Sequence, residues 1–212
     1  MSSVTIPTPD LAPRMRAEQR RELILEAATS VFGERGYVGT TTDAVARAAG
    51  VSQPYVVRMF GTKERLFLEV LQRALDRLLA TFRAAIADPT PFVGADDTLG
   101  RRMGRAYAEL LLDRGLLLSL MHSFLLGADP AIGAAARAGF LQVYRVLREE
   151  AGFSATETDQ FLAHGMMMNT MVGLRMADEY VGGDLCAKDL LETAMPQKLD
   201  VLLRTSAENK PA

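Results

Sequence analysis

The stretch from Thr40 to Lys63 constrains the fold of this chain more than any other part of the sequence. Thr41 can cap a short helix, and the apolar residues that follow it recur at helical spacing. Gly50 comes just after the last of them and can take the left-handed conformation that ends a helix. Ser52 can then cap a second helix, in which apolar residues lie four apart on one face. The pattern predicts two short helices joined by a tight turn.

Two helices that cross at a large angle over a turn of three or four residues form a helix-turn-helix, whose second helix is shaped to enter the major groove of DNA. The residues that point away from the apolar face of this helix are Gln53, Tyr55, Arg58 and Met59. Gln53 could read an adenine. The Arg58 guanidinium could hold a guanine edge or a phosphate, and the alternative is an ion pair with a carboxylate of the first helix.

The composition of the chain favours an all-α class. Of the 212 residues 49% are hydrophobic and 24% charged, and helix formers are plentiful while strand-type runs are few. The single cysteine, Cys186, excludes an internal disulfide framework, and no metal-ligand cluster is present. No nucleophile, phosphate or dinucleotide motif occurs, and the two histidines lie on different predicted helices. We therefore expect no cofactor and rank an enzyme last.

The charge of the chain bears on whether it binds DNA, and its targeting signals bear on its location in the cell. The net charge is −2, and residues 1–65 carry two more positive than negative charges, which supports a DNA-facing end only weakly. No secretory signal is recognisable, and the apolar runs are too short for a membrane helix. We expect a soluble cytoplasmic protein with no membrane contact.

Three segments are predicted along the chain. Residues 1–15 hold three prolines among small polar residues and read as a disordered tail. Residues 16–62 form a three-helix domain around the helix-turn-helix, and residues 63–212 form a second, helical domain. Arginines 14, 16, 20 and 21 could place an arm against DNA, or they could form a solvated charged face.

Residues 24–71 resemble the N-terminal DNA-binding domain of the TetR family of bacterial transcriptional regulators. The resemblance, which covers roughly residues 16–72, rests on these residues: Ala27, Ala28, Phe32, Gly36, Tyr37, Thr41, Thr42, Ala49 to Ser52, Phe60, Lys63 and Glu64. It implies that Thr42 and Lys63 bind phosphate, at helix N-termini where free N–H groups also favour an anion. The DNA contacts expected in total are Thr42, Gln53, Pro54, Tyr55, Arg58 and Lys63.

The recognition helix departs from the family pattern. The family often has a tyrosine where Val57 stands, an aromatic residue or histidine where Met59 stands, and a small residue or threonine where Tyr55 stands. The phosphate-binding hydroxyl is therefore lost at Val57. Tyr55 could replace it or lie over a thymine methyl group.

Helical spacing continues after Lys63 without a linker, to about Ala87, which predicts one long helix shared by both domains. Further helices are expected near residues 96–113, 115–127, 130–151, 155–181 and 187–205. Asp129-Pro130 and the capping box from Ser154 to Glu157 place two of their starts. About nine helices are predicted in all.

The second domain is rich in large apolar side chains with a few polar groups among them, a composition typical of a ligand pocket between helices. The candidate pocket residues are Met103, Tyr107, Met121, His122, Phe124, Leu125, Phe140, Tyr144 and Asn169. Plain core packing is the alternative for each of them. The sequence does not assign Met166, Met167, Met168 and Met171 to core, pocket or partner subunit.

By the resemblance, the last two helices form a homodimer interface, where Gly165 and Gly173 would permit close approach. The chain is then predicted to be a dimeric regulator, most simply a repressor, that a small apolar ligand releases from a palindromic operator. The alternatives are an effector-independent DNA-binding or activating protein and, last, an all-α enzyme.

Overall fold

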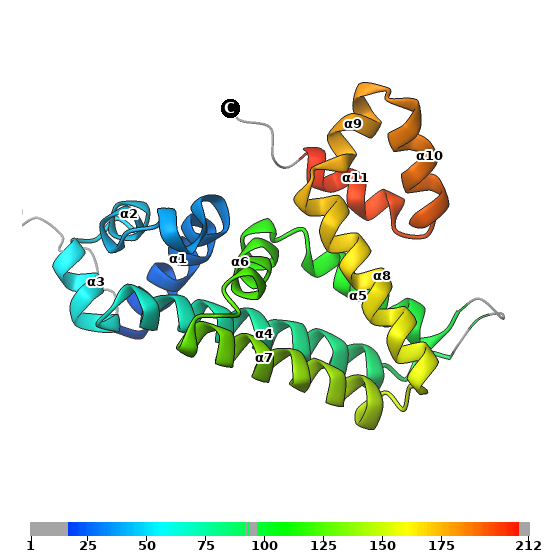
Figure 1. Ribbon diagram of the computed structural model, residues 1–212. Helices are drawn as coiled ribbons and strands as arrows, with labels where there is room; N and C mark the ends of the chain where they lie inside the picture. The colour runs from blue at the N-terminus through cyan, green and yellow to red at the C-terminus, as the bar shows by residue number, and fades with distance from the viewer. Residues whose placement is uncertain (1–16, 92, 94–96, 208–212) are drawn as a thin grey trace, which may run out of the picture.

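The protein is all-helical in the computed structural model, which describes residues 17–91, 93 and 97–207 (Figure 1). The predicted tail 1–15 lies outside the described residues. The elements are α1 (Ala17–Gly39), α2 (Thr42–Ala48), α3 (Gln53–Phe60), α4 (Lys63–Ala87), α5 (Leu99–Leu110), α6 (Arg114–Leu125), α7 (Pro130–Arg145), the π-helical η1 (Val146–Glu150), α8 (Ala155–Gly173), α9 (Met176–Gly182), α10 (Leu185–Ala194) and α11 (Leu199–Ala207).

The expectation of about nine helices is therefore too low for the described residues, which contain eleven α-helices. The difference arises near the C-terminus, where both of the last predicted helices are broken. Arg175 takes a left-handed conformation (φ 56°) between α8 and α9, and a turn from Met195 to Lys198 separates α10 from α11. Helical periodicity passes through both breaks, so the apolar pattern did not reveal them.

The helix-turn-helix forms as the sequence predicts. The Thr41 hydroxyl accepts from the N–H of Ala44 at 3.1 Å and caps α2. Gly50 takes the left-handed conformation (φ 65°), and Val51 donates its N–H to the carbonyl oxygen of Ala46 at 3.0 Å. Ser52 begins α3, but its hydroxyl accepts no capping hydrogen bond, so that detail of the prediction is wrong.

The core of the N-terminal domain includes the first half of α4. The rings of Phe32 and Phe67 lie 4.8 Å apart between centroids, and Tyr37 packs 5.1 Å from Phe67. Val56 and Phe60 of α3 are buried in the same cluster. Edge-to-face and tilted aromatic pairs of this kind add to the area that they bury. Because α4 supplies part of this core, the recognition helix is seated on a helix that continues into the second domain.

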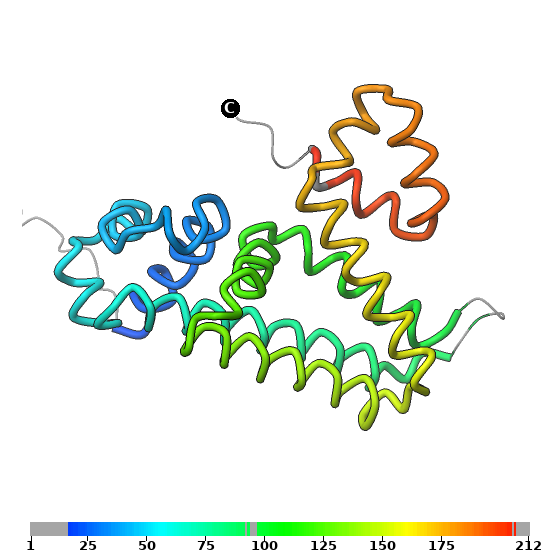
Figure 2. The backbone as a smooth tube through the Cα atoms, viewed as in Figure 1, coloured from blue at the N-terminus to red at the C-terminus, as the bar shows by residue number. Residues whose placement is uncertain are grey.

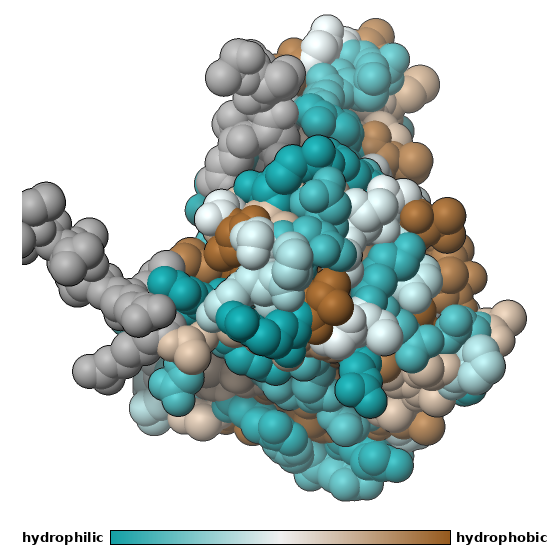
Figure 3. Space-filling view, turned by 90° about the vertical axis from the view of Figure 1, so that its left-hand side faces the viewer, coloured by the Kyte–Doolittle hydropathy of each residue, from teal (hydrophilic) through white to brown (hydrophobic). Residues whose placement is uncertain are grey.

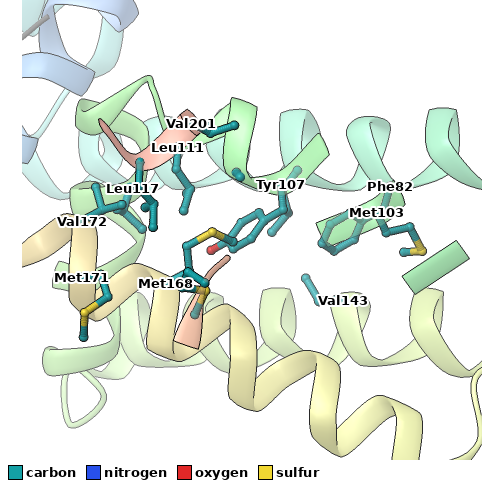
Figure 4. Packing of buried hydrophobic residues seen from close by; sticks show 14 of the residues in the cluster. Phe82, Met103, Tyr107, Leu111, Leu117, Val143, Met168, Met171, Val172 and Val201 are labelled. Atoms are coloured by element: carbon teal, nitrogen blue, oxygen red, sulfur yellow. The ribbon is translucent and has the colours of Figure 1, made fainter. Parts of the chain in front are cut away.

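The second half of α4 packs into a separate core with α5, α7 and α8. Figure 2 shows α4 and α7 running side by side along the molecule, with α8 crossing above them. The buried side chains of Phe82, Tyr107 and Met168 converge from three helices in this core (Figure 4). With 25 residues, α4 spans about 37 Å and joins the two cores as one rod.

A second junction between the two halves lies where α1 meets α6. A Cβ atom at Gly33 would lie only 2.8 Å from the Cα of Gly115, so the two backbones nearly touch. One turn further along α6, the Ser119 hydroxyl donates to the carbonyl oxygen of Thr29 at 3.4 Å. The ring of His122 then lies beside Gly36.

The described helices have little potential to span a membrane. None of them is by itself long and apolar enough to cross a bilayer. The pair formed by α6 and residues 130–150, which bends by 116°, meets the criterion by length and composition only.

Candidate DNA interface and ligand cavity

The outer face of α3 carries a stack of charged and aromatic side chains. Two guanidinium groups lie over the Tyr55 ring, that of Arg58 at 4.8 Å and that of Arg20 at 5.7 Å from the ring centroid. Tyr55 is half-buried and Arg58 exposed. Each cation faces the π-system of the ring, which orders all three side chains. The stack presents two positive charges at the surface where a recognition helix meets DNA.

The alternative expected for Arg58, an ion pair with a carboxylate of α1, does not form within the described residues. The ion pair at this junction belongs instead to Arg21, which bonds Glu69 of α4 and lies over the Phe60 ring at 5.1 Å. Arg58 therefore keeps its guanidinium N–H groups available for a base edge or a phosphate.

Two of the predicted DNA contacts are bonded to each other. The Gln53 Nε2 donates to the Thr42 Oγ1 at 3.1 Å, which ties the first turn of α3 to the first turn of α2. Pro54 is exposed beside them in the first turn of α3. The bond leaves the side-chain oxygen of Gln53 to face outward as an acceptor, while Thr42 holds the amide in place.

Lys63 stands at the N-terminus of α4 and is held there by Tyr37. Its Nζ donates to the Tyr37 carbonyl oxygen at 3.0 Å and lies 4.5 Å from the centroid of the Tyr37 ring. The Thr62 hydroxyl caps the same helix by accepting from the N–H of Arg65 at 3.1 Å. A cation fixed at a helix N-terminus is suited to a phosphate group, because the helix dipole and the charge act in the same direction.

Figure 3 looks onto the end of the molecule formed by α1, α2 and α3, where hydrophilic residues predominate around isolated hydrophobic ones. The structure thus brings all six predicted DNA contacts to one end of the molecule on α2, α3 and the start of α4. The stacking of Arg20 on Tyr55 was not predicted, although the basic character of the residues before α1 pointed to that region.

A cavity of about 120 Å³ lies in the second domain between α4, α6, α7 and α8. Four of the nine predicted pocket residues line it, namely Tyr107, Phe124, Phe140 and Asn169. The rings of Phe124 and Phe140 meet edge to face at 6.2 Å, and both are partly exposed. An apolar cavity of roughly 150 Å³ is known to hold a molecule the size of benzene, so this one suits a small apolar group as it stands.

The other five predicted pocket residues do not line this cavity. Met103 is fully buried in the core and Met121 packs against that core, while His122 faces α1 at Gly36. Leu125 and Tyr144 are exposed, Leu125 by 83%. Helical spacing identifies an apolar face but does not separate the side chains that touch a cavity from those one position around the helix.

The cavity has one polar pair at its wall. The Tyr107 hydroxyl donates to Asn169 Oδ1 at 2.6 Å, and burial raises the pKa of this tyrosine to about 12. Among the described residues, the Asn169 Nδ2 donates only to the sulfur of Met166, at 3.8 Å. Sulfur is a weak acceptor, so this amide can donate a stronger hydrogen bond to an oxygen of a bound molecule.

Sequence reasoning identified Phe140 on α7 but none of the other lining residues on α4 and α7. Those other residues are Leu68, Leu71, Gln72, Leu75, Leu78, Phe82, Ala135, Ala136, Gly139 and Val143. The signal was the run of alanine and glycine on α7 opposite leucines on α4, since small residues facing large ones leave space between helices. Gly139 shows this directly, because a Cβ there would lie 3.1 Å from Leu75 Cδ2.

The methionines of α8 take different environments. Met168 and Met171 are buried in the core, Met166 lines the cavity and Met167 is 41% exposed. Gly165 also lines the cavity, facing Tyr107, whereas Gly173 has open space around it. The two glycines therefore have different surroundings, and their close approach at a dimer interface stays a prediction.

Comparison with known proteins identifies the N-terminal domain. Residues 24–70 match the sequence model described as "Bacterial regulatory proteins, tetR family". The N-terminal domain belongs to the TetR family. The chain is 40% identical over 77 residues to the HTH-type transcriptional activator FasR of Mycolicibacterium smegmatis and 36% identical over 72 residues to the regulator RutR of Escherichia coli K12. These matches cover 36% and 34% of this chain and 35% and 34% of those proteins, so the chain matches about a third of the length of each relative.

Solved structures of TetR-type proteins share the whole fold. A TetR-like regulator from Rhodococcus sp. RHA1 aligns with a TM-score of 0.52 and 23% identity over 93% of this chain and 100% of its own. A TetR-family member from Streptomyces coelicolor A3 aligns with a TM-score of 0.54 and 19% identity over 92% and 99%. The likeness to these structures therefore extends over both halves of the chain as a likeness of fold.

Proposed function

We propose that the protein is a homodimeric transcriptional regulator that binds a palindromic operator through α3 and leaves it when a small, largely apolar ligand enters the cavity. The observation that carries the DNA-binding part is the exposed Tyr55–Arg58 stack on the outer face of α3. In a dimer, two such helices about 34–36 Å apart would meet successive major grooves on one side of the duplex.

The individual DNA contacts take distinct roles in this proposal. Arg58 and Gln53 read base edges, since the guanidinium matches guanine and the free amide oxygen of Gln53 can accept from a base amino group. Thr42, Pro54 and Lys63 position the domain on the backbone, Lys63 by its charge at the start of α4. Tyr55 orients Arg58 and packs its ring edge toward the groove.

The ligand part rests on the position of the cavity between α4 and α6. Helix α4 carries the seat of α3 at one end and the cavity wall at the other, and α6 touches both the cavity and α1. A ligand that widens this space moves both connections to the DNA-binding domain. Coupling of this kind amounts to about 1–3 kcal/mol and requires tighter ligand binding to the DNA-free state.

The dimer interface is assigned to α8 and α10. Met167 on α8, Leu174 just after its end, and Leu185 and Leu190 on α10 are exposed apolar residues of the second domain. The last helix, α11, turns inward instead, where Val201 and Leu202 are buried. A shared surface of α8 and α10 related by a two-fold axis would cover these side chains.

The direction of regulation is a separate question. The relatives include both an activator, FasR, and a repressor, NicS of Pseudomonas putida, which is 31% identical over 77 residues. We propose repression, because ligand-induced release is the simplest outcome of a cavity placed against α4. The competing function is an effector-independent DNA-binding activator.

Selection of bound fragments from random DNA tests the DNA-binding function. We expect enrichment of a two-fold symmetric sequence with half-sites one helical turn apart, and no enriched sequence would contradict it. Thermal unfolding in the presence of a library of apolar metabolites then distinguishes a ligand-released repressor from an effector-independent activator. A ligand present at 100 times its Kd should stabilise the protein by about 2.7 kcal/mol and lower its operator affinity, whereas no response to any compound favours the effector-independent protein.

A further inference from the structure

A second cleft, with a volume of about 650 Å³, opens on the other side of α8 from the cavity. Its walls are the first turn of α5, the first half of α8 and the turn between α10 and α11. Phe161 borders both spaces, but the polar residues of the cleft do not reach the cavity. Nothing in the proposed regulatory function uses this cleft.

Lys198 in the wall of the cleft is an ammonium group without a partner among the described residues. Its side chain is half-buried, and its Nζ lies 3.0 Å from the place where a Cβ at Gly104 would stand. Burial lowers the pKa of this lysine. Glycine at position 104 is what leaves room for the ammonium group against α5.

Two neighbouring arginines, on α5 and α11, are in ion pairs, which sets Lys198 apart from them. Arg105 bonds Asp200 at 2.8 Å, and Arg204 bonds Glu109. A half-buried charge that lacks a counter-ion is unfavourable, because solvation is lost without any compensating attraction. An anion that enters the cleft would supply that counter-ion.

The start of α5 adds to the positive potential of the cleft. Leu99, Gly100 and Arg101 line it, and the Thr98 hydroxyl accepts from the N–H of Arg101 at 3.3 Å. The N–H groups of Leu99 and Gly100 have no acceptor within the helix, and the helix dipole favours an anion at this end. Three sources of positive potential, an ammonium, a guanidinium and a helix N-terminus, thus face one space.

Acidic groups do not cancel this potential. Glu157 is the acidic residue among those that line the cleft, and its carboxylate accepts from the N–H of Ser154 at 2.8 Å in the capping box. The remaining wall is largely apolar, with Phe153, Phe161 and Met195 beside the polar groups. The cleft therefore combines an anion-binding end with an aromatic surface.

We propose that this cleft binds a small amphipathic carboxylate, with its anionic group between Lys198 and the first turn of α5 and its apolar body against Phe153 and Phe161. A simple inorganic anion would match the charge but leave the aromatic surface uncovered. Occupancy of this cleft can be measured on the protein alone, so the test does not depend on the proposed DNA-binding function.

The test is calorimetric titration of the full-length protein with 4-phenylbutyrate, with its neutral analogue 4-phenyl-1-butanol and with inorganic phosphate. We expect saturable binding of the carboxylate at least tenfold tighter than that of the alcohol or phosphate. Lys198→Gln should weaken carboxylate binding at least tenfold and remove the preference over the alcohol. Lys188→Gln, which changes a half-buried lysine on α10 outside the cleft, serves as the matched control and should bind as the wild type does.

A cavity variant shows which space is occupied. Ala136→Leu narrows the first cavity and should leave binding of 4-phenylbutyrate unchanged. The proposal is overturned if the wild type binds none of the carboxylate up to millimolar concentration, if Lys198→Gln binds it as well as the wild type does, or if phosphate binds equally tightly. Because Lys198→Gln removes an unpaired charge, its melting temperature should not fall, which separates lost binding from lost folding.

Discussion

Replacing Gly33 by alanine should separate α1 from α6 at the junction between the two halves of the protein. The new Cβ would lie 2.8 Å from the Cα and 3.0 Å from the carbonyl oxygen of Gly115, and both of these are backbone atoms that cannot rotate away. Ordinary van der Waals contact begins near 3.4 Å, so the helices must move apart by roughly 0.6 Å.

The expected change in stability is the sum of two opposing effects. Overpacking of a tight interface costs about 1–3 kcal/mol. Alanine in place of glycine inside a helix gains about 1 kcal/mol, because the unfolded chain loses backbone freedom. Gly165→Ala is the matched control, since a Cβ at this glycine of α8 would meet Tyr107 at an ordinary 3.8 Å.

The measurement is thermal unfolding of both variants without ligand or DNA. Gly165→Ala should raise the melting temperature, and Gly33→Ala should melt below the control by about 4–8 °C for a difference of about 2 kcal/mol in the free energy of unfolding. Equal melting temperatures would show that α1 and α6 do not pack through their backbones, and would refute this route of coupling.

Three further predictions concern the DNA contacts, the dimer and an acidic residue. Lys63→Ala should weaken binding to all DNA sequences about equally and reduce the salt dependence of the affinity by about one phosphate contact. Fluorescence anisotropy at several salt concentrations measures both effects. A loss of affinity that depends on the DNA sequence would contradict a phosphate-binding role for Lys63. Leu174→Glu, at the C-terminal end of α8, should convert the dimer to a monomer in light scattering. Leu125→Glu, at a still more exposed leucine of α6, should leave the dimer intact; a dimer that survives Leu174→Glu would exclude the C-terminal end of α8 from the interface. Hydrogen bonds from Arg102 hold the pKa of Asp97 at about 2, below its usual 3.8. The stability that this pair contributes is therefore present above pH 3.8 and is lost as the pH falls through about 2. Carbon-13 titration of the Asp97 carboxyl should show the lowered pKa, and an equally low pKa in Arg102→Gln would contradict the assigned cause.

Local sequence signals predicted the N-terminal domain in detail because its residues act through short-range chemistry. Thr41 and Gly50 cap and end α2 by contacts within a few residues, and the capping box from Ser154 to Glu157 starts α8 for the same reason. The contact of Tyr55 with Arg20 could not be predicted, since Arg20 comes from a different helix.

The cavity was only half predictable because its shape depends on how helices pack. Tyr107 and Asn169 were identified as polar groups among apolar ones, but their mutual hydrogen bond joins residues 62 positions apart. His122 and Met103 share the helical periodicity of the lining residues but do not line the cavity. His122 lies beside Gly36, and Met103 is buried in the core. The break at Arg175 was missed because a left-handed residue other than glycine leaves little trace in a sequence.

The most direct test of DNA reading by α3 is a base-by-base substitution of the selected operator, measured with the wild type, with Arg58→Ala and with Arg47→Ala as the control. Arg47 is an exposed arginine on α2 that is paired with Asp43 at 3.1 Å. We expect Arg58→Ala to remove discrimination at one position of each half-site, at a cost of about 1–3 kcal/mol, while Arg47→Ala keeps the full pattern. If Arg58→Ala weakens operator and random DNA alike, the exposed stack on α3 does not read the sequence.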